Sequence, residues 1–142
     1  MKEAKIKTLD LIWLALMGGQ VLFLMVTLLF LKGDLAQKDL QGMIDIAAAV
    51  FLLPSLAMSQ LLYRKFMQRA KGVEVALSEK LAIYQNATIV KGALMEGGNL
   101  FCIIALILTN SQWLVIPIVA VLGFFFLQRP SVNKFDAALE GI

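Results

Sequence analysis

The chain contains no histidine and a single cysteine, Cys102. Zinc sites of the usual ligand type, Ser-His-Asp triads and Cys-His nucleophile systems all need residues that are absent. One cysteine also excludes a disulfide within the chain. We therefore predict no catalytic residue, no metal and no cofactor, and we expect a protein that is not an enzyme.

Charged residues are also scarce. They make up 16% of the 142 residues, whereas 60% are hydrophobic; soluble domains are closer to a quarter charged and half apolar. The apolar residues gather in runs of a length that crosses a membrane, about 20 residues for a helix. The sequence therefore predicts one domain of 142 residues with four spans, at approximately 10–31, 42–63, 87–109 and 113–128.

These spans predict an all-α integral membrane protein, a four-helix bundle in the bilayer. Polar residues 64–82 are expected to form a cytoplasmic loop with an interfacial helix that leads into the third span. The tail, 129–142, carries Val132, Phe135 and Leu139 at helical spacing, which favours a helix along the membrane surface. Pro54 is expected to kink the second span, with Ser55 compensating the freed carbonyl.

The positions of lysine and arginine predict the orientation. The N-terminal segment, residues 64–82 and the tail together hold ten of the 13, whereas the 32–41 connection holds two and the 110–112 connection none. Cytoplasmic loops are enriched in lysine and arginine. Both termini should therefore face the cytoplasm, across a cell inner (plasma) membrane. Aromatic residues fit this orientation, with Trp13, Tyr63 and Tyr84 expected at the inner interface and Trp113 at the outer one.

The third span carries a carboxylate, Glu96, and an amide, Asn99, inside its apolar run. An ionisable group in hydrocarbon is costly, about 3 kcal/mol on insertion scales, and needs a partner, a proton or a wet cavity. The expected hydrogen-bond partners are Gln20 in the first span and Ser55 or Ser59 in the second. Two interpretations fit: Glu96 is a proton or cation site supported by Asn99 and Gln20, or it is a neutral acid that joins helices by hydrogen bonds.

A helical wheel of the third span, at about 100° per residue, places polar and small residues on one face. That face holds Thr88, Lys91, Gly92, Glu96, Asn99 and Ile103. The opposite face holds Leu94, Gly97, Phe101, Ala105 and Leu108. We therefore expect substitution of Gly92 by leucine to disturb packing more than substitution of Gly97 and Gly98.

Two further charged features have structural explanations. Asp45 opens the second span near the outer interface, where it would stabilise the helix N-terminus. Arg64, Lys65, Arg69 and Lys71 form a basic cluster at the membrane surface. This cluster fits topology and anionic headgroups of the lipid bilayer, and we do not expect nucleic acid as a partner.

A short internal similarity links the first and third spans. Residues 15–19, Ala-Leu-Met-Gly-Gly, match residues 93–97, Ala-Leu-Met-Glu-Gly, and a Leu-Phe pair follows in both. The pattern fits a duplicated helical hairpin in which both copies have the same orientation. It fits equally a chance similarity among leucine, methionine and glycine in membrane helices.

The segment Ala93-Leu94-Met95-Glu96-Gly97 also carries a family resemblance. The chain is similar to uncharacterised small four-span bacterial inner-membrane proteins with an Ala-Leu-x-Glu-Gly motif in the third span. The resemblance covers most of the chain and implies no known activity. The carboxylate helix also resembles that of ATP synthase proteolipids, but here the carboxylate lies on the first helix of a hairpin and both turns are expected outside.

These features predict a non-enzymatic scaffold or accessory subunit that acts through helix association, as a homo-oligomer or in a larger membrane complex. The alternative is a proton- or cation-linked channel or transporter component that uses Glu96. The two differ in whether Glu96 faces a dry helix contact or a wet cavity.

Overall fold

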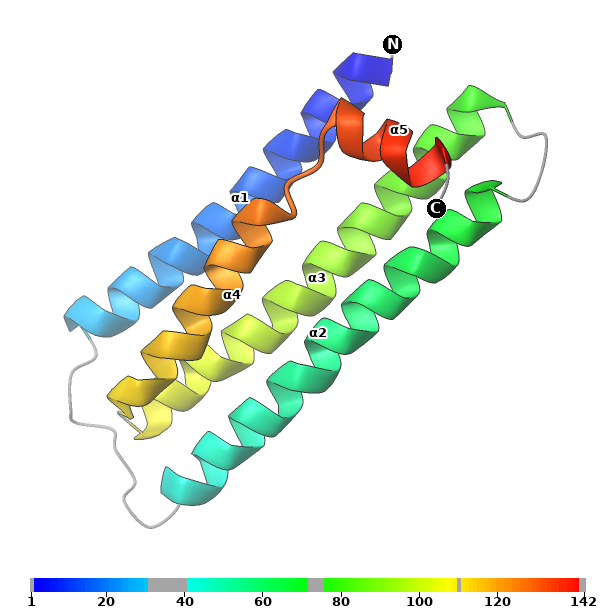
Figure 1. Cartoon of the computed structure of the whole chain (residues 1–142). Coiled ribbons are helices and arrows are strands. Elements are labelled where there is room, and N and C mark those ends of the chain that lie inside the picture. The colour runs from blue at the N-terminus through cyan, green and yellow to red at the C-terminus, as the bar shows by residue number, and fades with distance from the viewer. Residues whose placement is uncertain (1, 31–40, 72–75, 110, 141–142) are drawn as a thin grey trace.

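The computed structural model describes residues 2–30, 41–71, 76–109 and 111–140 (Figure 1). This part of the chain forms helices joined by short connections and contains no strand. The helices are α1 (Lys2–Phe30), α2 (Gln41–Lys71), α3 (Leu77–Thr109), a short 3-10 helix η2 (Gln112–Leu114), α4 (Val115–Leu127) and α5 (Val132–Glu140). The expected all-α fold is confirmed. A backbone surrounded by hydrocarbon must satisfy its own hydrogen bonds, and apolar runs of this length do so as helices.

Three helices, α1, α2 and α3, are long and apolar enough to cross a membrane. The expected fourth span, 113–128, corresponds to η2 and α4 together, Gln112–Leu127. Within it α4 has 13 residues, about 20 Å of helix, whereas the hydrocarbon core is about 30 Å thick. A fourth crossing is reached in the described residues only if the η2–α4 unit and α5 are counted together across a bend of 79°.

The first three helices extend beyond the apolar runs. α1 begins at Lys2, α2 continues to Lys71, and α3 begins at Leu77. The 64–82 segment, expected to be a loop with its own interfacial helix, is therefore largely the ends of α2 and α3. The physical reason is that a helix continues past the apolar run wherever the polar sequence also favours helix and contains no breaker.

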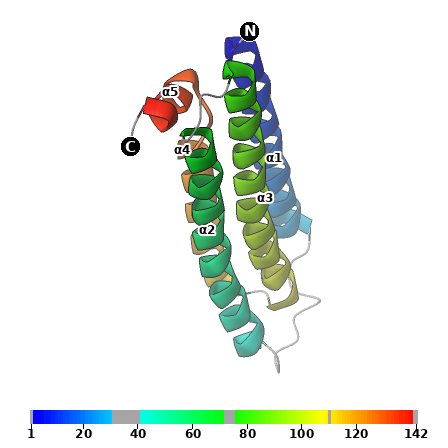
Figure 2. The same ribbon diagram turned by 90° about the vertical axis from the view of Figure 1, so that its right-hand side faces the viewer.

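The helix α3 forms the centre of the molecule, and α1, α2 and α4 pack around it (Figures 1 and 2). Half of its most apolar window is buried inside the protein, compared with 22% for α1 and 17% for α2. The outer faces of α1 and α2 are consequently apolar and exposed. In a membrane such faces meet lipid, so their exposure needs no further explanation.

The buried surface of α3 includes the expected polar face and is wider than that face. All of its residues except Glu96 are buried: Thr88, Lys91, Gly92, Asn99 and Ile103. Gly98 is also buried, and so is Ala105, which was expected on the outer face. Leu108, Phe101 and Gly97 are exposed, as predicted. The buried surface extends to Cys102 because α2 packs there: the Cys102 thiol lies 3.7 Å from the Ala48 carbonyl oxygen. The residues on this added side of α3 are apolar or small, as are those facing lipid, so the hydrophobic pattern does not distinguish them.

The tail helix α5 folds back over the ends of the other helices, and both termini lie at this end of the molecule (Figure 1). Its Phe135 is 1% exposed and packs edge-on against Tyr84, with ring centroids 5.1 Å apart. The predicted helix is present, and its Phe135 packs into the protein; the expected position of the helix along the membrane surface stays a prediction. Its helical spacing with Val132 and Leu139 serves one buried cluster.

Candidate functional site

A completely buried polar contact joins α1 to α3. The Asn99 side-chain amide donates a hydrogen bond to the Gln20 Oε1 atom at 2.8 Å, and both residues are completely buried. Two of the predicted site residues are thus brought together. The Asn99 Oδ1 atom is buried and has no hydrogen-bond partner among the described residues. The pair holds two helices together where the surroundings are otherwise apolar.

The two predicted serines bond within their own helix. The Ser55 hydroxyl donates to the Phe51 carbonyl at 2.9 Å, and the Ser59 hydroxyl donates to the Leu56 carbonyl at 2.6 Å. Ser55 therefore does not reach the carbonyl of Val50, which Pro54 leaves without its helical donor. We expected Gln20, Ser55 or Ser59 to bond to Glu96. None of the three forms a hydrogen bond with it. Serine in an apolar helix commonly bonds to the preceding turn.

Glu96 lies at the edge of the contact between α1 and α3. Gly92 and Asn99, one turn before and one turn after it, face Trp13 and Gln20 of α1. Glu96 shares this stripe and is half-buried. Within the described chain no hydrogen bond or ion pair joins it to another residue. The carboxyl group is therefore available at the membrane-facing edge of the bundle.

At the far end of the bundle, Asp45 connects α2 to the start of the η2–α4 unit. Its Oδ2 atom accepts hydrogen bonds from the Ser111 hydroxyl at 2.6 Å and from the Trp113 indole N–H at 3.1 Å. Asp45 is 6% exposed. We expected Asp45 to stabilise the N-terminus of its own helix. The structure adds these two tertiary contacts, which fix α2 against the turn that follows α3.

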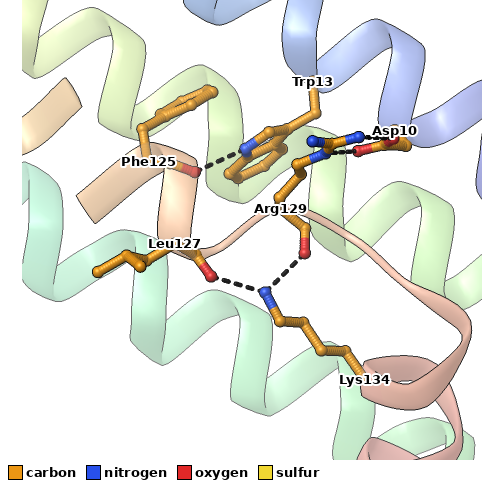
Figure 3. A network of polar contacts seen from close by, with 6 residues as sticks. All are labelled: Asp10, Trp13, Phe125, Leu127, Arg129 and Lys134. Carbon is orange, nitrogen blue, oxygen red and sulfur yellow. Dashed lines mark hydrogen bonds and ion pairs between the residues drawn. The ribbon is translucent and has the colours of Figure 1, made fainter. Parts of the chain in front are cut away.

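A larger polar network connects α1 with the end of α4 (Figure 3). The Arg129 guanidinium donates to both Asp10 carboxylate oxygens, at 2.6 and 2.7 Å, and this hydrogen bond raises the pKa of Arg129 above its usual value. The Lys134 ammonium donates to the Leu127 and Arg129 carbonyls, both at 2.6 Å. These are the last carbonyls of α4 and the turn after it, so Lys134 caps the helix.

Trp13 completes this network from inside the bundle. Its indole N–H donates to the Phe125 carbonyl at 2.7 Å, and its ring stacks on the Phe125 ring with centroids 4.2 Å apart (Figure 3). Trp13 is 1% exposed, so its ring packs inside the bundle; its expected depth at the inner interface stays a prediction. The sequence signal that could have found this network was the presence of Asp10 and Arg129, one of each sign, at the same end of two apolar runs.

The predicted basic cluster divides between two faces of α2. Arg64 and Lys71 line a cavity near the chain termini, whereas Lys65 and Arg69 do not. Sequence spacing explains this, because residues seven apart lie on one face of a helix. The cavity also contains Lys91, whose ammonium lies 4.4 Å from the centre of the Tyr63 ring.

No group of three or more potential ligands capable of holding a metal ion is found among the residues with described positions. No protein-family model, curated protein or solved structure matches this chain. Its function must therefore be inferred from the arrangement of its own residues.

Proposed function

We propose that this protein is a non-enzymatic scaffold or accessory subunit of a cell inner (plasma) membrane, which acts by associating through its membrane helices with a second copy or with a larger complex. The single observation that carries the proposal is Glu96. It is a carboxyl group in the apolar part of α3, half-buried at an edge of the bundle, and none of the described residues bonds to it.

Such a group is stabilised most simply by a helix from outside the chain. Polar side chains join membrane helices by hydrogen bonds, worth about 0.6 kcal/mol on average and up to about 2 kcal/mol. A neutral, protonated Glu96 has both a donor and an acceptor for such a contact. Because Gln20 and Asn99 already bond to each other, they do not compete for it.

Small residues on the outer faces of α1 and α3 favour the same function. Gly18, Gly19 and Gly97 are exposed, and a Cβ atom added at any of them would have no described neighbour within 4 Å. These glycines are thus not needed for packing inside the described chain. Small residues allow the backbones of membrane helices to approach closely, so they offer a contact surface for another helix.

The proposal includes four membrane crossings, of which η2 and α4 form the fourth, with both termini and the tail, 129–142, in the cytoplasm. Every lysine and arginine of the described segments lies in the half of the bundle that holds the termini (Figure 1). This distribution supports the orientation by the positive-inside rule.

The test compares two substitutions of Glu96 in the full chain, purified in mild detergent and in lipid nanodiscs. Glu96→Gln retains a donor and an acceptor without charge, so the assembly should keep its mass. Glu96→Leu removes both and should shift the assembly toward the 15.6 kDa monomer. Glu79→Gln, at an exposed position on the same helix, is the control and should change nothing.

Two outcomes would contradict the proposal. One is a wild-type protein that is monomeric in nanodiscs and brings no membrane protein with it after crosslinking in cells. The other is a proton or cation flux in liposomes that the Gln variant abolishes while its folding is intact. That flux would establish the alternative, a channel or transporter component using Glu96, because an amide cannot release a proton near neutral pH.

A further inference from the structure

A cavity of about 780 Å³ lies between α2, α3, α4 and α5, at the end of the bundle that holds the termini. Its size is in the range of pockets that bind small molecules, about 300 to 1,000 Å³. Its walls combine two kinds of residue. One group is apolar or aromatic, and the other is cationic: Arg64, Lys71, Lys91 and Lys134.

Positive charge predominates around this cavity. None of the described residues that line it is acidic, and the ion pairs Lys2–Asp136 and Arg129–Asp10 involve neither Arg64 nor Lys91. Cations such as Arg64, Lys91 and Lys134 that face one cavity repel one another unless an anion lies between them. The cavity is therefore electrostatically complementary to a negatively charged group.

Lys91 gives the strongest reason to expect a negatively charged group in the cavity. It is only 8% exposed, and its ammonium contacts the face of the Tyr63 ring. A cation–π contact compensates only part of the loss of water around an ammonium group. Because no carboxylate of the described chain pairs with Lys91, an anion in the cavity would supply its missing partner.

A second polar group here interacts only with Tyr84, without a hydrogen bond of normal geometry. The Thr88 side chain, one helical turn before Lys91, is 3% exposed and lines the cavity. Its hydroxyl oxygen is buried and makes no hydrogen bond to any described residue. Buried polar groups normally have a partner, and an exception suggests a bound group. Hydroxyl and ammonium donors together suit the oxygens of a phosphate.

The apolar wall of the cavity indicates where this phosphate comes from. Phe124 and Leu127 line the cavity and are 38% and 72% exposed. They belong to the apolar outer surface of α4, so the cavity is continuous with a surface that would face lipid. A water-soluble phosphate compound would gain nothing from this wall, whereas the acyl chains of a phospholipid would bury it.

We propose that this cavity binds the phosphate-bearing headgroup of an anionic phospholipid, with Arg64, Lys91 and Thr88 contacting the phosphate and the acyl chains against Phe124 and Leu127. Basic pockets between membrane helices bind anionic headgroups by this chemistry. The site is separate from Glu96, so it does not depend on the proposed helix association.

The experiment measures lipid binding to the purified full chain in detergent by native mass spectrometry. Phosphatidylglycerol is titrated against phosphatidylcholine, which has the same acyl chains but no net charge. We expect phosphatidylglycerol to bind at least fivefold more tightly, and this preference to weaken with salt. Arg64→Gln should reduce its affinity about fivefold or more. Arg64 is exposed on α2, so this variant should fold.

Matched variants separate this site from a general attraction to basic surface. Arg69→Gln removes an exposed arginine of the same helix that does not line the cavity, and it should change the affinity less than twofold. Thr88→Val keeps the shape of the side chain and should reduce the affinity a few-fold. Circular dichroism and a melting curve accompany each variant.

Three results would overturn the proposal. The first is equal affinity for the two lipids. The second is an equal loss of affinity in Arg64→Gln and Arg69→Gln, which would indicate a diffuse basic surface. The third comes from adding glycerol 3-phosphate: binding of this compound as tight as that of phosphatidylglycerol would make the ligand a soluble phosphate instead. If phosphatidylglycerol binds as expected and Glu96→Leu leaves the assembly intact, only the association proposal fails.

Discussion

Asp10 and Arg129 are 119 positions apart in the chain and form a two-pronged ion pair, with both carboxylate oxygens bonded to the guanidinium at 2.6 and 2.7 Å. The pair fixes α1 to the end of α4. It lies beside the Trp13–Phe125 stack, so a polar and an aromatic contact act on the same two helices (Figure 3). The planar guanidinium matches a carboxylate in this geometry, which a lysine cannot reproduce.

We predict that Asp10→Asn and Arg129→Gln each lower the melting temperature of the purified protein, because each leaves a hydrogen-bonded charge without its partner. The exchanged double variant, Asp10→Arg with Arg129→Asp, should recover part of the loss. Glu3→Gln, at an exposed position of the same helix, is the control. The melting temperature of the double variant is compared with the value expected from adding the losses of its two single exchanges, Asp10→Arg and Arg129→Asp. A double variant that melts no higher than this value would show that the pair contributes nothing.

The contact between Gln20 and Asn99 leads to a second prediction. Asn99→Leu removes one partner and leaves the buried Gln20 amide unsatisfied, which should destabilise the bundle by about 1–3 kcal/mol. Replacing both residues with leucine should cost less than the two single changes together, because no polar group is then left alone. Unfolding in sodium dodecyl sulfate, followed by circular dichroism, measures the difference. Strictly additive losses would argue against the contact.

The glycines of α3 should differ sharply in how well they tolerate substitution by alanine. A Cβ at Gly98 would lie 2.9 Å from the Ser55 Cβ, and one at Gly92 would lie 3.0 Å from the Trp13 ring. Alanine at either position should destabilise the protein by about 1–3 kcal/mol, as overpacking does. Gly97→Ala meets no described atom within 4 Å and should be neutral or stabilising by about 0.5–1 kcal/mol.

This order revises the expectation from the helical wheel, in which Gly98 would tolerate a larger residue better than Gly92. Thermal unfolding of the three variants decides between the two. If Gly98→Ala proves as stable as Gly97→Ala, the close contact between α2 and α3 is wrong.

The orientation of the protein is tested by single cysteines in a Cys102→Ala background. A cysteine at Gln37, which lies outside the described residues, should react from the cell exterior with a thiol reagent that does not cross the membrane. Cysteines at Lys71 and Asn133 should react only after the membrane is opened. External labelling at position 71 would reverse the proposed orientation.

The amino-acid sequence by itself determined the helices and the tail's helical spacing. Runs of apolar residues such as Leu11 to Leu31 leave a backbone in lipid no other way to satisfy its hydrogen bonds. The sequence also identified Gln20, Asn99 and Glu96 as unusual, because polar groups in such runs are costly wherever they lie. Neither conclusion depends on how the helices pack.

Only the tertiary structure decided which of these groups meet. Gln20 bonds to Asn99 and not to Glu96, Asp45 reaches Trp113, and Arg64 shares a cavity with Lys91. The physical reason is that the pattern of one helix indicates its own inward face but not the residues of the other helices that face it. Close fit at positions such as Gly92 and Gly98 sets these pairings, and this fit exists only between helices already packed together.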